Sequence, residues 1–208
     1  MIPEYILKNI PALIHPPRTG GTSLRNAIIE KYGPDALPGR KDRQGRGIKP
    51  GDWNKHSRLE QLDIDEDRNV VMLVRNPYER YFSMYQFNKG KVGNPEPFEF
   101  FKLMMRGQLF TATNQSLKEN NHHSMGTWHH PRVSDIIRYE TYAEDIKRVY
   151  DININEYKHI NKTNNRTNIA ALIDQKTLDL LNYLSMMDFY DFGYERLETV
   201  QQVKRAFT

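Results

Sequence analysis

The first residues able to do chemistry form the run Arg18-Thr19-Gly20-Gly21-Thr22-Ser23, which follows the short apolar segment Ile10–His15 and a Pro-Pro pair. The adjacent glycines let the backbone approach a ligand closely, and the amides that follow lie at an expected helix start, where the dipole favours an anion. The arginine adds a forked charged donor and the hydroxyls add neutral ones. The pattern predicts a cradle for a phosphate-sized anion, with an ordinary tight turn as the alternative. It is not a Walker loop, because Gly-Lys-Ser/Thr is missing.

A second group of polar residues follows the apolar run Val70–Val74. Arg75 comes directly after this run, and Ser83 lies on the helix expected next. Because ligands of parallel sheets bind at the carboxyl ends of the strands, a guanidinium and a hydroxyl here can converge on a second anion. The alternative is a surface ion pair of Arg75 with Glu79 or Asp65. Together the two groups fit a ligand with phosphates at two separated positions.

The elements that must position these groups are strands and helices in alternation. Ile10–His15, Val70–Val74 and Val133–Tyr139 are expected strands, and the five apolar residues of the second predict a strand covered on both faces. A helix is expected from Leu24 to about Lys31, and another from Pro77 to about Phe87. The second has Asn76 as its N-cap and Glu79 in the capping-box position. Further helices are expected over Pro97–Arg106, over Tyr142–Tyr150 and in a segment capped by Asp174. Residues 33–58 resemble a long cationic loop. We predict an α/β, P-loop-like three-layer fold with a central, mainly parallel sheet flanked by helices.

Composition limits the kind of protein. The 208 residues predict one catalytic domain over 1–208, and 38% hydrophobic residues exclude a disordered chain. The absence of cysteine excludes thiolate chemistry and disulfides, and no apolar run is long enough for a membrane helix. With no signal peptide pattern at the start, we expect a soluble, cytoplasmic protein. The net charge of +4 mildly favours an anionic ligand.

Four motifs together resemble a known family. Ile14–Leu24 (IHPPRTGGTSL) is similar to the 5′-phosphosulfate loop of sulfotransferases that use 3′-phosphoadenosine-5′-phosphosulfate (PAPS), and Val70–Tyr85 (VVMLVRNPYERYFSMY) to their 3′-phosphate motif. Ile137–Glu140 (IRYE) and Asp188–Tyr194 (DFYDFGY) resemble two further family signatures. The likeness covers nearly the whole chain and is closest to the carbohydrate branch, which includes the heparan 2-O and chondroitin enzymes. The Golgi members have a membrane anchor, and we expect none here because no apolar run is long enough.

The resemblance implies roles for particular residues. In-line transfer of a sulfuryl group from PAPS to an acceptor hydroxyl, which leaves 3′-phosphoadenosine-5′-phosphate (PAP), needs no metal. A base is needed, and the resemblance assigns this role to His56. Lys55 could help to neutralise the charge of the transferring group. Arg18 stands where the family has lysine, which changes the donor geometry, and it is expected to act on the leaving phosphate. The expected PAPS-binding residues are Arg18, Thr19, Gly20, Gly21, Thr22, Ser23, Leu24, Arg75, Ser83 and Arg166.

The roles of several other histidine and aromatic residues have more than one interpretation. His15 could face the cofactor or pack at the strand end, and Trp128 and Tyr85 could stack on a sugar or adenine or belong to the core. His122, His123, His129 and His130 fit an acceptor-binding loop better than a metal site. The expected partner is a hydroxyl-bearing glycan or similar small molecule, with neither nucleic acid nor membrane. The alternatives are a small-molecule or nucleotide kinase with a degenerate phosphate loop, or a nucleic-acid-binding domain.

Overall fold

The structure is a computed structural model that describes residues 9–41, 47–48, 56–109, 124–157 and 168–207. The chain forms two compact units, which are described separately. Unit 1 comprises Met1–Val74 and Trp128–Lys162, and unit 2 comprises Arg75–Thr127 and Thr163–Thr208. The expectation of one catalytic domain over 1–208 stays a prediction.

A three-stranded parallel sheet forms the centre of unit 1. Its strands are β1 (Ala12–Ile14), β5 (Val70–Val74) and β6 (Val133–Arg138), in the order β1-β5-β6. Ala12 pairs with Val70 and Leu73 with Ile137, and the register between β5 and β6 shifts after Val70. Each residue of β5 is buried, as its unbroken apolar run predicts for the middle strand.

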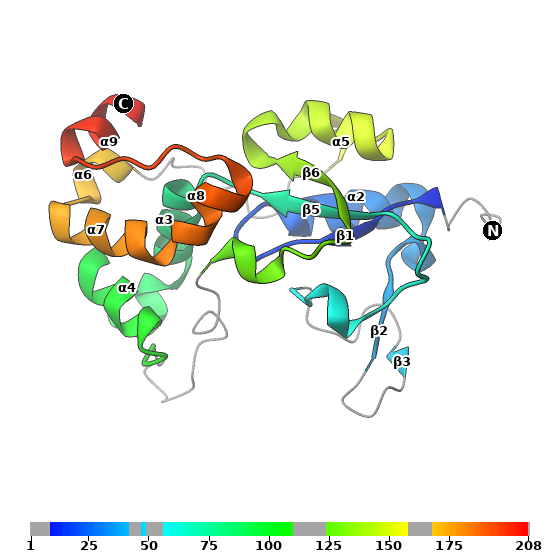
Figure 1. The fold of residues 1–208 in the computed structure, drawn as a ribbon, viewed down its shortest axis with the longest axis horizontal. Coiled ribbons are helices and arrows are strands. Elements are labelled where there is room, and N and C mark those ends of the chain that lie inside the picture. Colours follow the sequence, from blue (N-terminus) through cyan, green and yellow to red (C-terminus); the bar gives the residue numbers. More distant parts are fainter. Residues whose placement is uncertain (1–8, 42–46, 49–55, 110–123, 158–167, 208) are drawn as a thin grey trace. The chain divides into compact units, whose positions relative to one another are not determined.

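Two helices cover one face of this sheet. They are α2 (Gly21–Tyr32) and α5 (Tyr142–Tyr150), which follow β1 and β6 respectively (Figure 1). The shared core contains Leu13, Leu73 and Ile137 from the strands with Leu24 of α2 and Ile146 of α5. Full burial of such side chains contributes roughly 1.5–3 kcal/mol each. The predicted α/β fold with a mainly parallel sheet flanked by helices is confirmed.

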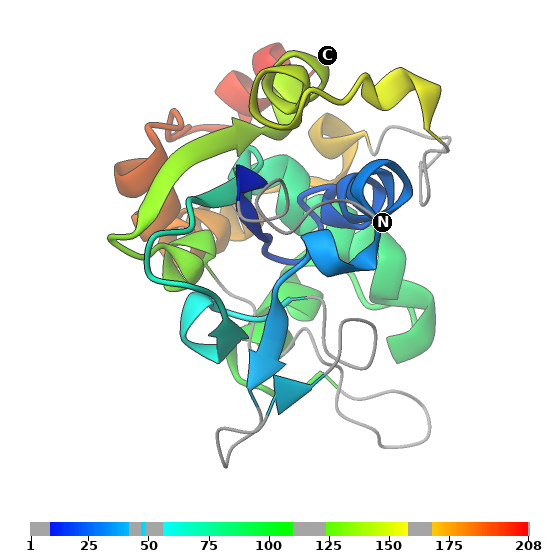
Figure 2. The same cartoon turned by 90° about the vertical axis from the view of Figure 1, so that its right-hand side faces the viewer.

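A second, smaller sheet lies in the segment between β1 and β5. It consists of β2 (Gly39–Lys41), β3 (Gly47–Ile48) and β4 (Leu62–Asp63), all antiparallel, in the order β3-β2-β4. Figure 2 shows these strands below the parallel sheet. The expectation of a plain loop over residues 33–58 was therefore wrong for β2 and β3, because their strand hydrogen bonds form without an apolar pattern in the sequence.

Unit 2 is helical in the part that the structure describes. Its α-helices are α3 (Pro77–Asn88), α4 (Pro97–Met105), α6 (Ile169–Leu172), α7 (Gln175–Leu184), α8 (Met186–Phe192) and α9 (Val200–Ala206). Their apolar faces meet in one core that includes Phe82, Phe101 and Leu181. Asp174 caps α7 by accepting a hydrogen bond from the Thr177 amide, as predicted. Across the described residues, no helix combines the length and the apolar character needed to cross a membrane.

Candidate active site

The loop between β1 and α2 joins a strand end to a helix start, as its sequence predicts, and its role as an anion cradle stays a prediction. Arg18 has φ 68° and Gly20 has φ 94°, so two residues adopt left-handed conformations within one short turn. The buried Thr19 hydroxyl donates to the Pro16 carbonyl at 2.7 Å, which closes the loop on itself. Gly20 is the N-cap of α2 and offers no side-chain cap, and the first turn of the helix holds no acidic residue. The Ser23 amide donates to the Gly20 carbonyl at 3.2 Å, so the amides of Gly21 and Thr22 are the first-turn donors that we expect an anion to use.

Two histidines from distant segments meet beside this loop. His15 directly follows β1 and is buried, and a Cβ on Gly21 would lie 2.1 Å from its ring. The ring of His56 stands edge-on to that of His15, with centroids 4.9 Å apart and an interplanar angle of 78°. His15 therefore packs at the strand end, and it joins the candidate base His56 to the first residue of α2.

Two tyrosines that sequence analysis did not single out hold the other side of the loop. The Tyr142 hydroxyl donates to the Gly20 carbonyl at 2.9 Å, and a Cβ on Gly20 would lie 2.9 Å from the Tyr139 ring. Burial raises the pKa of Tyr142 above its usual value, which keeps this hydroxyl protonated as a donor. The signals in the sequence are the Ile137–Glu140 signature, which includes Tyr139, and the position of both tyrosines after β6, at the same sheet edge as the loop.

The aromatic side chains that could have stacked on a ligand are core residues. Trp128 is 3% exposed and Tyr85 is 5% exposed, so the stacking interpretation of both is wrong. The Trp128 indole donates to the His56 carbonyl, and the Tyr85 hydroxyl donates to the Pro95 carbonyl. The one polar group of each side chain is therefore hydrogen-bonded to the protein backbone.

The second predicted group lies at the start of α3 in unit 2. The Asn76 side chain accepts hydrogen bonds from the amides of Tyr78 and Glu79, which confirms the predicted cap. Glu79 does not complete a capping box, because its carboxylate accepts from Nε and Nη2 of Arg75 at 3.2 and 3.1 Å. Ser83 follows Glu79 by four residues and shares its side of the helix. Arg75, which lies between β5 and the cap of α3, therefore forms a row at the start of this helix with Glu79 and Ser83.

Comparison with protein families gives one match. A model of the sulfotransferase domain matches residues 53–154. The chain's resemblance to sulfotransferases is thereby supported. The match supports sulfuryl transfer as the general reaction, and hence a transferase that acts on a sulfate donor and an acceptor. Sulfotransferases of this family generally use PAPS as the donor. Comparison with curated proteins and with solved structures found no match.

The matched region contains only part of the candidate site. His56, Arg75 and Ser83 lie within residues 53–154, together with the Ile137–Glu140 signature at the end of β6. The glycine loop at residues 18–24 lies before it. The loop's assignment to sulfotransferase chemistry therefore depends on its own motif and geometry.

Some predicted residues lie outside the described part of the chain. These are Arg166, Lys55, His122 and His123. His129 is exposed, and Nδ1 of His130 accepts a hydrogen bond from the Arg132 amide at 3.1 Å. Within the described ranges, no group of three or more His, Asp or Glu side chains is arranged to hold a metal ion.

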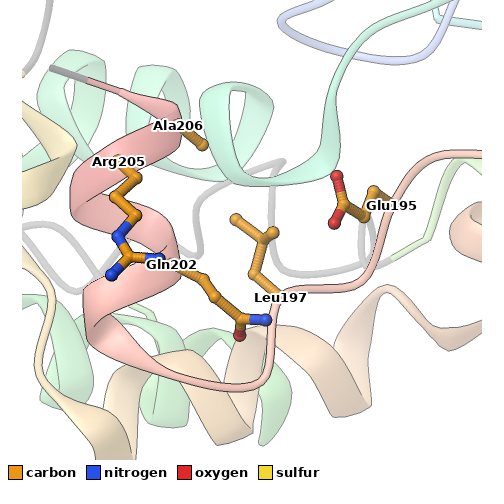
Figure 3. Close-up of a pocket in the computed structure, with 5 residues that line it drawn as sticks. All are labelled: Glu195, Leu197, Gln202, Arg205 and Ala206. Atoms are coloured by element: carbon orange, nitrogen blue, oxygen red, sulfur yellow. The ribbon is translucent and has the colours of Figure 1, made fainter.

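A pocket in unit 2 holds none of the predicted site residues. Figure 3 shows it between α9 and the segment before that helix, where Glu195, Leu197, Gln202, Arg205 and Ala206 line it. The Gln202 amide oxygen accepts hydrogen bonds from the Glu198 and Thr199 amides, so this side chain caps α9. The pocket therefore lies apart from the residues to which the proposed chemistry is assigned.

Proposed function

We propose that this protein is a PAPS-dependent sulfotransferase that sulfates a hydroxyl group of a carbohydrate, with His56 as the general base. One observation carries the proposal: the His56 ring contacts His15, whose ring lies against Gly21 at the start of α2. A base candidate and an anion-binding turn are thereby joined through a single side chain. A proton acceptor beside a phosphosulfate cradle is what transfer to a hydroxyl requires.

The glycine loop suits the sulfate end of the donor. PAPS supplies an activated sulfuryl group whose phosphate leaving group gains negative charge during transfer. Arg18 and the first-turn amides of α2 are the donors proposed to stabilise that charge, and the helix dipole acts in the same direction. Donors of this kind are worth about 2.7–4 kcal/mol each in comparable oxyanion sites. Replacement of the family lysine by Arg18 keeps the charge and provides a planar fork.

The row on α3 is proposed to bind the 3′-phosphate. Arg75 supplies a guanidinium and Ser83 a hydroxyl, and the resemblance adds Arg166. The residue after β5 also argues against the kinase alternative, because such enzymes need carboxylate ligands for Mg²⁺ and Arg75 stands there instead of Asp. The nucleic-acid alternative has only the pI near 9.1 and the basic stretch from Arg40 to Lys49 in its favour.

The carbohydrate acceptor is the part of the proposal that depends most on resemblance. The motifs are closest to the carbohydrate branch of the family, and the basic chain is suited to an acidic glycan. A sugar hydroxyl is a weak nucleophile until its proton is accepted, which is the role given to His56. A screen of glycan acceptors with radiolabelled PAPS tests this choice directly.

Binding measurements test the donor. The purified protein is titrated with PAP, with ATP plus Mg²⁺ and with an oligonucleotide, and only PAP is expected to bind tightly. Arg75→Ala should weaken PAP binding about 10–100-fold through the loss of charged hydrogen bonds, whereas exposed Arg106→Ala should not. His56→Ala should keep PAP affinity and lower turnover about 10²–10⁴-fold. Absence of PAP binding by the wild-type protein would refute the proposal.

A further inference from the structure

The main chain of His56 is held by a buried tryptophan. The Trp128 indole N–H donates to the His56 carbonyl at 3.3 Å, although the two residues are 72 positions apart. The Arg58 guanidinium lies over the Trp128 ring, 5.5 Å from its centroid. Because a buried donor that loses its acceptor costs about 1–3 kcal/mol, the indole and the His56 backbone are expected to stay together.

The side chain of His56 is held by a second carbonyl. Its Nδ1 lies 3.2 Å from the His15 carbonyl oxygen. A carbonyl oxygen only accepts hydrogen bonds, so the contact is favourable when Nδ1 carries the hydrogen. A neutral imidazole has a single N–H, and Nε2 is then the nitrogen that carries no hydrogen and can accept a proton. The edge-on contact with the His15 ring further restrains the plane of the His56 ring.

We propose that Trp128 and the His15 carbonyl are positioning groups that hold His56 as its Nδ1–H tautomer, with Nε2 as the proton acceptor. This inference rests on the proposed function, in which His56 is the base. In that reaction the acceptor O–H proton passes to Nε2 while the acceptor oxygen bonds to sulfur. The bond between sulfur and the bridging phosphate oxygen breaks, and its electron pair leaves with the phosphate. The resulting imidazolium keeps its Nδ1–H bond to the His15 carbonyl, so both states of the base share one orientation.

The arrangement explains why Trp128 is buried instead of exposed to a ligand. Its ring lies beneath Arg58, and its indole N–H is directed to the protein backbone. Loss of the indole N–H would free the backbone carbonyl of His56, and it would remove no group that is proposed to contact PAPS. The effect should therefore appear in kcat, since a displacement of a catalytic group by about 1 Å can cost up to 10²-fold.

The first test compares two aromatic substitutions. Trp128→Phe removes the indole donor, and Tyr150→Phe is a matched control that also removes one buried aromatic donor to a backbone carbonyl, in the same unit. Trp128→Phe should lower kcat about tenfold or more with the dissociation constant for PAP unchanged. Tyr150→Phe should lower the melting temperature with kcat unchanged. A Trp128→Phe enzyme that keeps wild-type kcat overturns the role of Trp128.

The second test reads the tautomer without any turnover. Nitrogen-15 NMR of histidine-labelled protein, with the His56 signals assigned from a His56→Ala variant, should show Nδ1 protonated and Nε2 unprotonated in neutral His56. An Nε2–H tautomer overturns the proposal even if Trp128→Phe does not fold. This spectrum is recorded without PAPS or PAP, so it tests the positioning proposal alone. The sulfotransferase proposal is tested separately by PAP binding.

Discussion

The imidazole of His15 lies directly against Gly21: a Cβ on Gly21 would be 2.1 Å from both Cγ and Nδ1 of the ring. Gly21→Ala must therefore displace His15, and with it the ring that His56 contacts. We expect this variant to lose about 1–3 kcal/mol of stability from overpacking and most of its PAP affinity. Urea unfolding and calorimetric titration measure the two effects.

A control and a rescue define this prediction. Gly33 has φ 81° with open space around its Cβ position, so Gly33→Ala should cost only about 1–2 kcal/mol of backbone strain and leave PAP binding intact. Adding His15→Ala to Gly21→Ala makes room for the new methyl group and should restore part of the stability. A single Gly21→Ala variant that binds PAP normally would show that the close packing is not needed.

Glu79 occupies the row in which the 3′-phosphate is expected. Its carboxylate pairs with Arg75, and the two side chains are 32% and 18% exposed. The Glu79 carboxylate would compete with a phosphate for the Arg75 guanidinium, and its negative charge would also repel the phosphate. Glu79→Gln should therefore tighten PAP binding about 3–10-fold, as measured by titration at low ionic strength.

The matched control for Glu79 is Glu99, which forms an exposed ion pair with Lys102 on α4. Glu99→Gln removes the same charge from the same unit and should leave PAP affinity unchanged. Weaker PAP binding by Glu79→Gln would mean that Glu79 orients Arg75 for the phosphate instead of competing with it.

The elements with strong local signals could be predicted from sequence. Five consecutive apolar residues define β5, and the Asn76 cap with Pro77 at the first helical position defines the start of α3. These signals are local, because they depend on burial and on backbone amides within one turn. The strand Gly39–Lys41 has no such signal, since its pairing with Gly47–Ile48 and Leu62–Asp63 arises from backbone hydrogen bonds alone.

In the candidate site, too, local features could be predicted from the sequence and contacts between distant residues could not. The glycine loop could be predicted because its chemistry lies in consecutive residues. The contacts of His56 with His15 and Trp128 join residues 41 and 72 positions apart, and no periodicity in the sequence reports them. Such contacts depend on which segments the fold brings together. For an ion pair of Arg75, the sequence left both Glu79 and Asp65 open as partners, and the structure shows the pair with Glu79.

Asp188 begins the carboxyl-terminal signature and is fully buried. Its Oδ1 accepts from the Ser124 hydroxyl at 2.6 Å and from the Gly126 amide at 2.9 Å. Asp188→Ala leaves the buried Ser124 hydroxyl without this acceptor, leaves the Gly126 amide only its bond to Ser124 Oγ at 3.1 Å, and removes the charge that faces buried Arg80. A loss of about 3–5 kcal/mol is therefore expected in urea unfolding.

Two further variants separate the causes of that loss. Asp188→Asn keeps an acceptor oxygen for Ser124 and Gly126 and should cost less than Asp188→Ala. Exposed Asp179→Ala, also in unit 2, should change stability by no more than about 0.5 kcal/mol. Equal stabilities for Asp188→Ala and the wild type would remove the signature's structural role.

The last prediction concerns alkaline pH and Tyr78. Its hydroxyl donates to Asn182 at 2.6 Å and accepts from the Leu197 amide at 2.9 Å, and burial raises its pKa from the ordinary value of 10.0 to about 12. The unfolded chain thus loses this proton near pH 10 and the folded chain near pH 12. Its contribution to stability is complete below pH 10 and is lost as the pH rises toward 12.

Tyr78→Phe should show two opposite effects in urea unfolding measured from pH 8 to 11.5. At pH 8 the variant should be less stable by about 1–3 kcal/mol, because the Leu197 amide loses its acceptor. Above pH 10 its stability should fall less steeply than that of the wild type, by up to about 1.4 kcal/mol per pH unit, since one linked proton is gone. Tyr183→Phe, which alters a side chain that is 68% exposed, should leave the slope unchanged. Equal slopes for Tyr78→Phe and the wild type would show that this phenol titrates alike in the folded and unfolded chains.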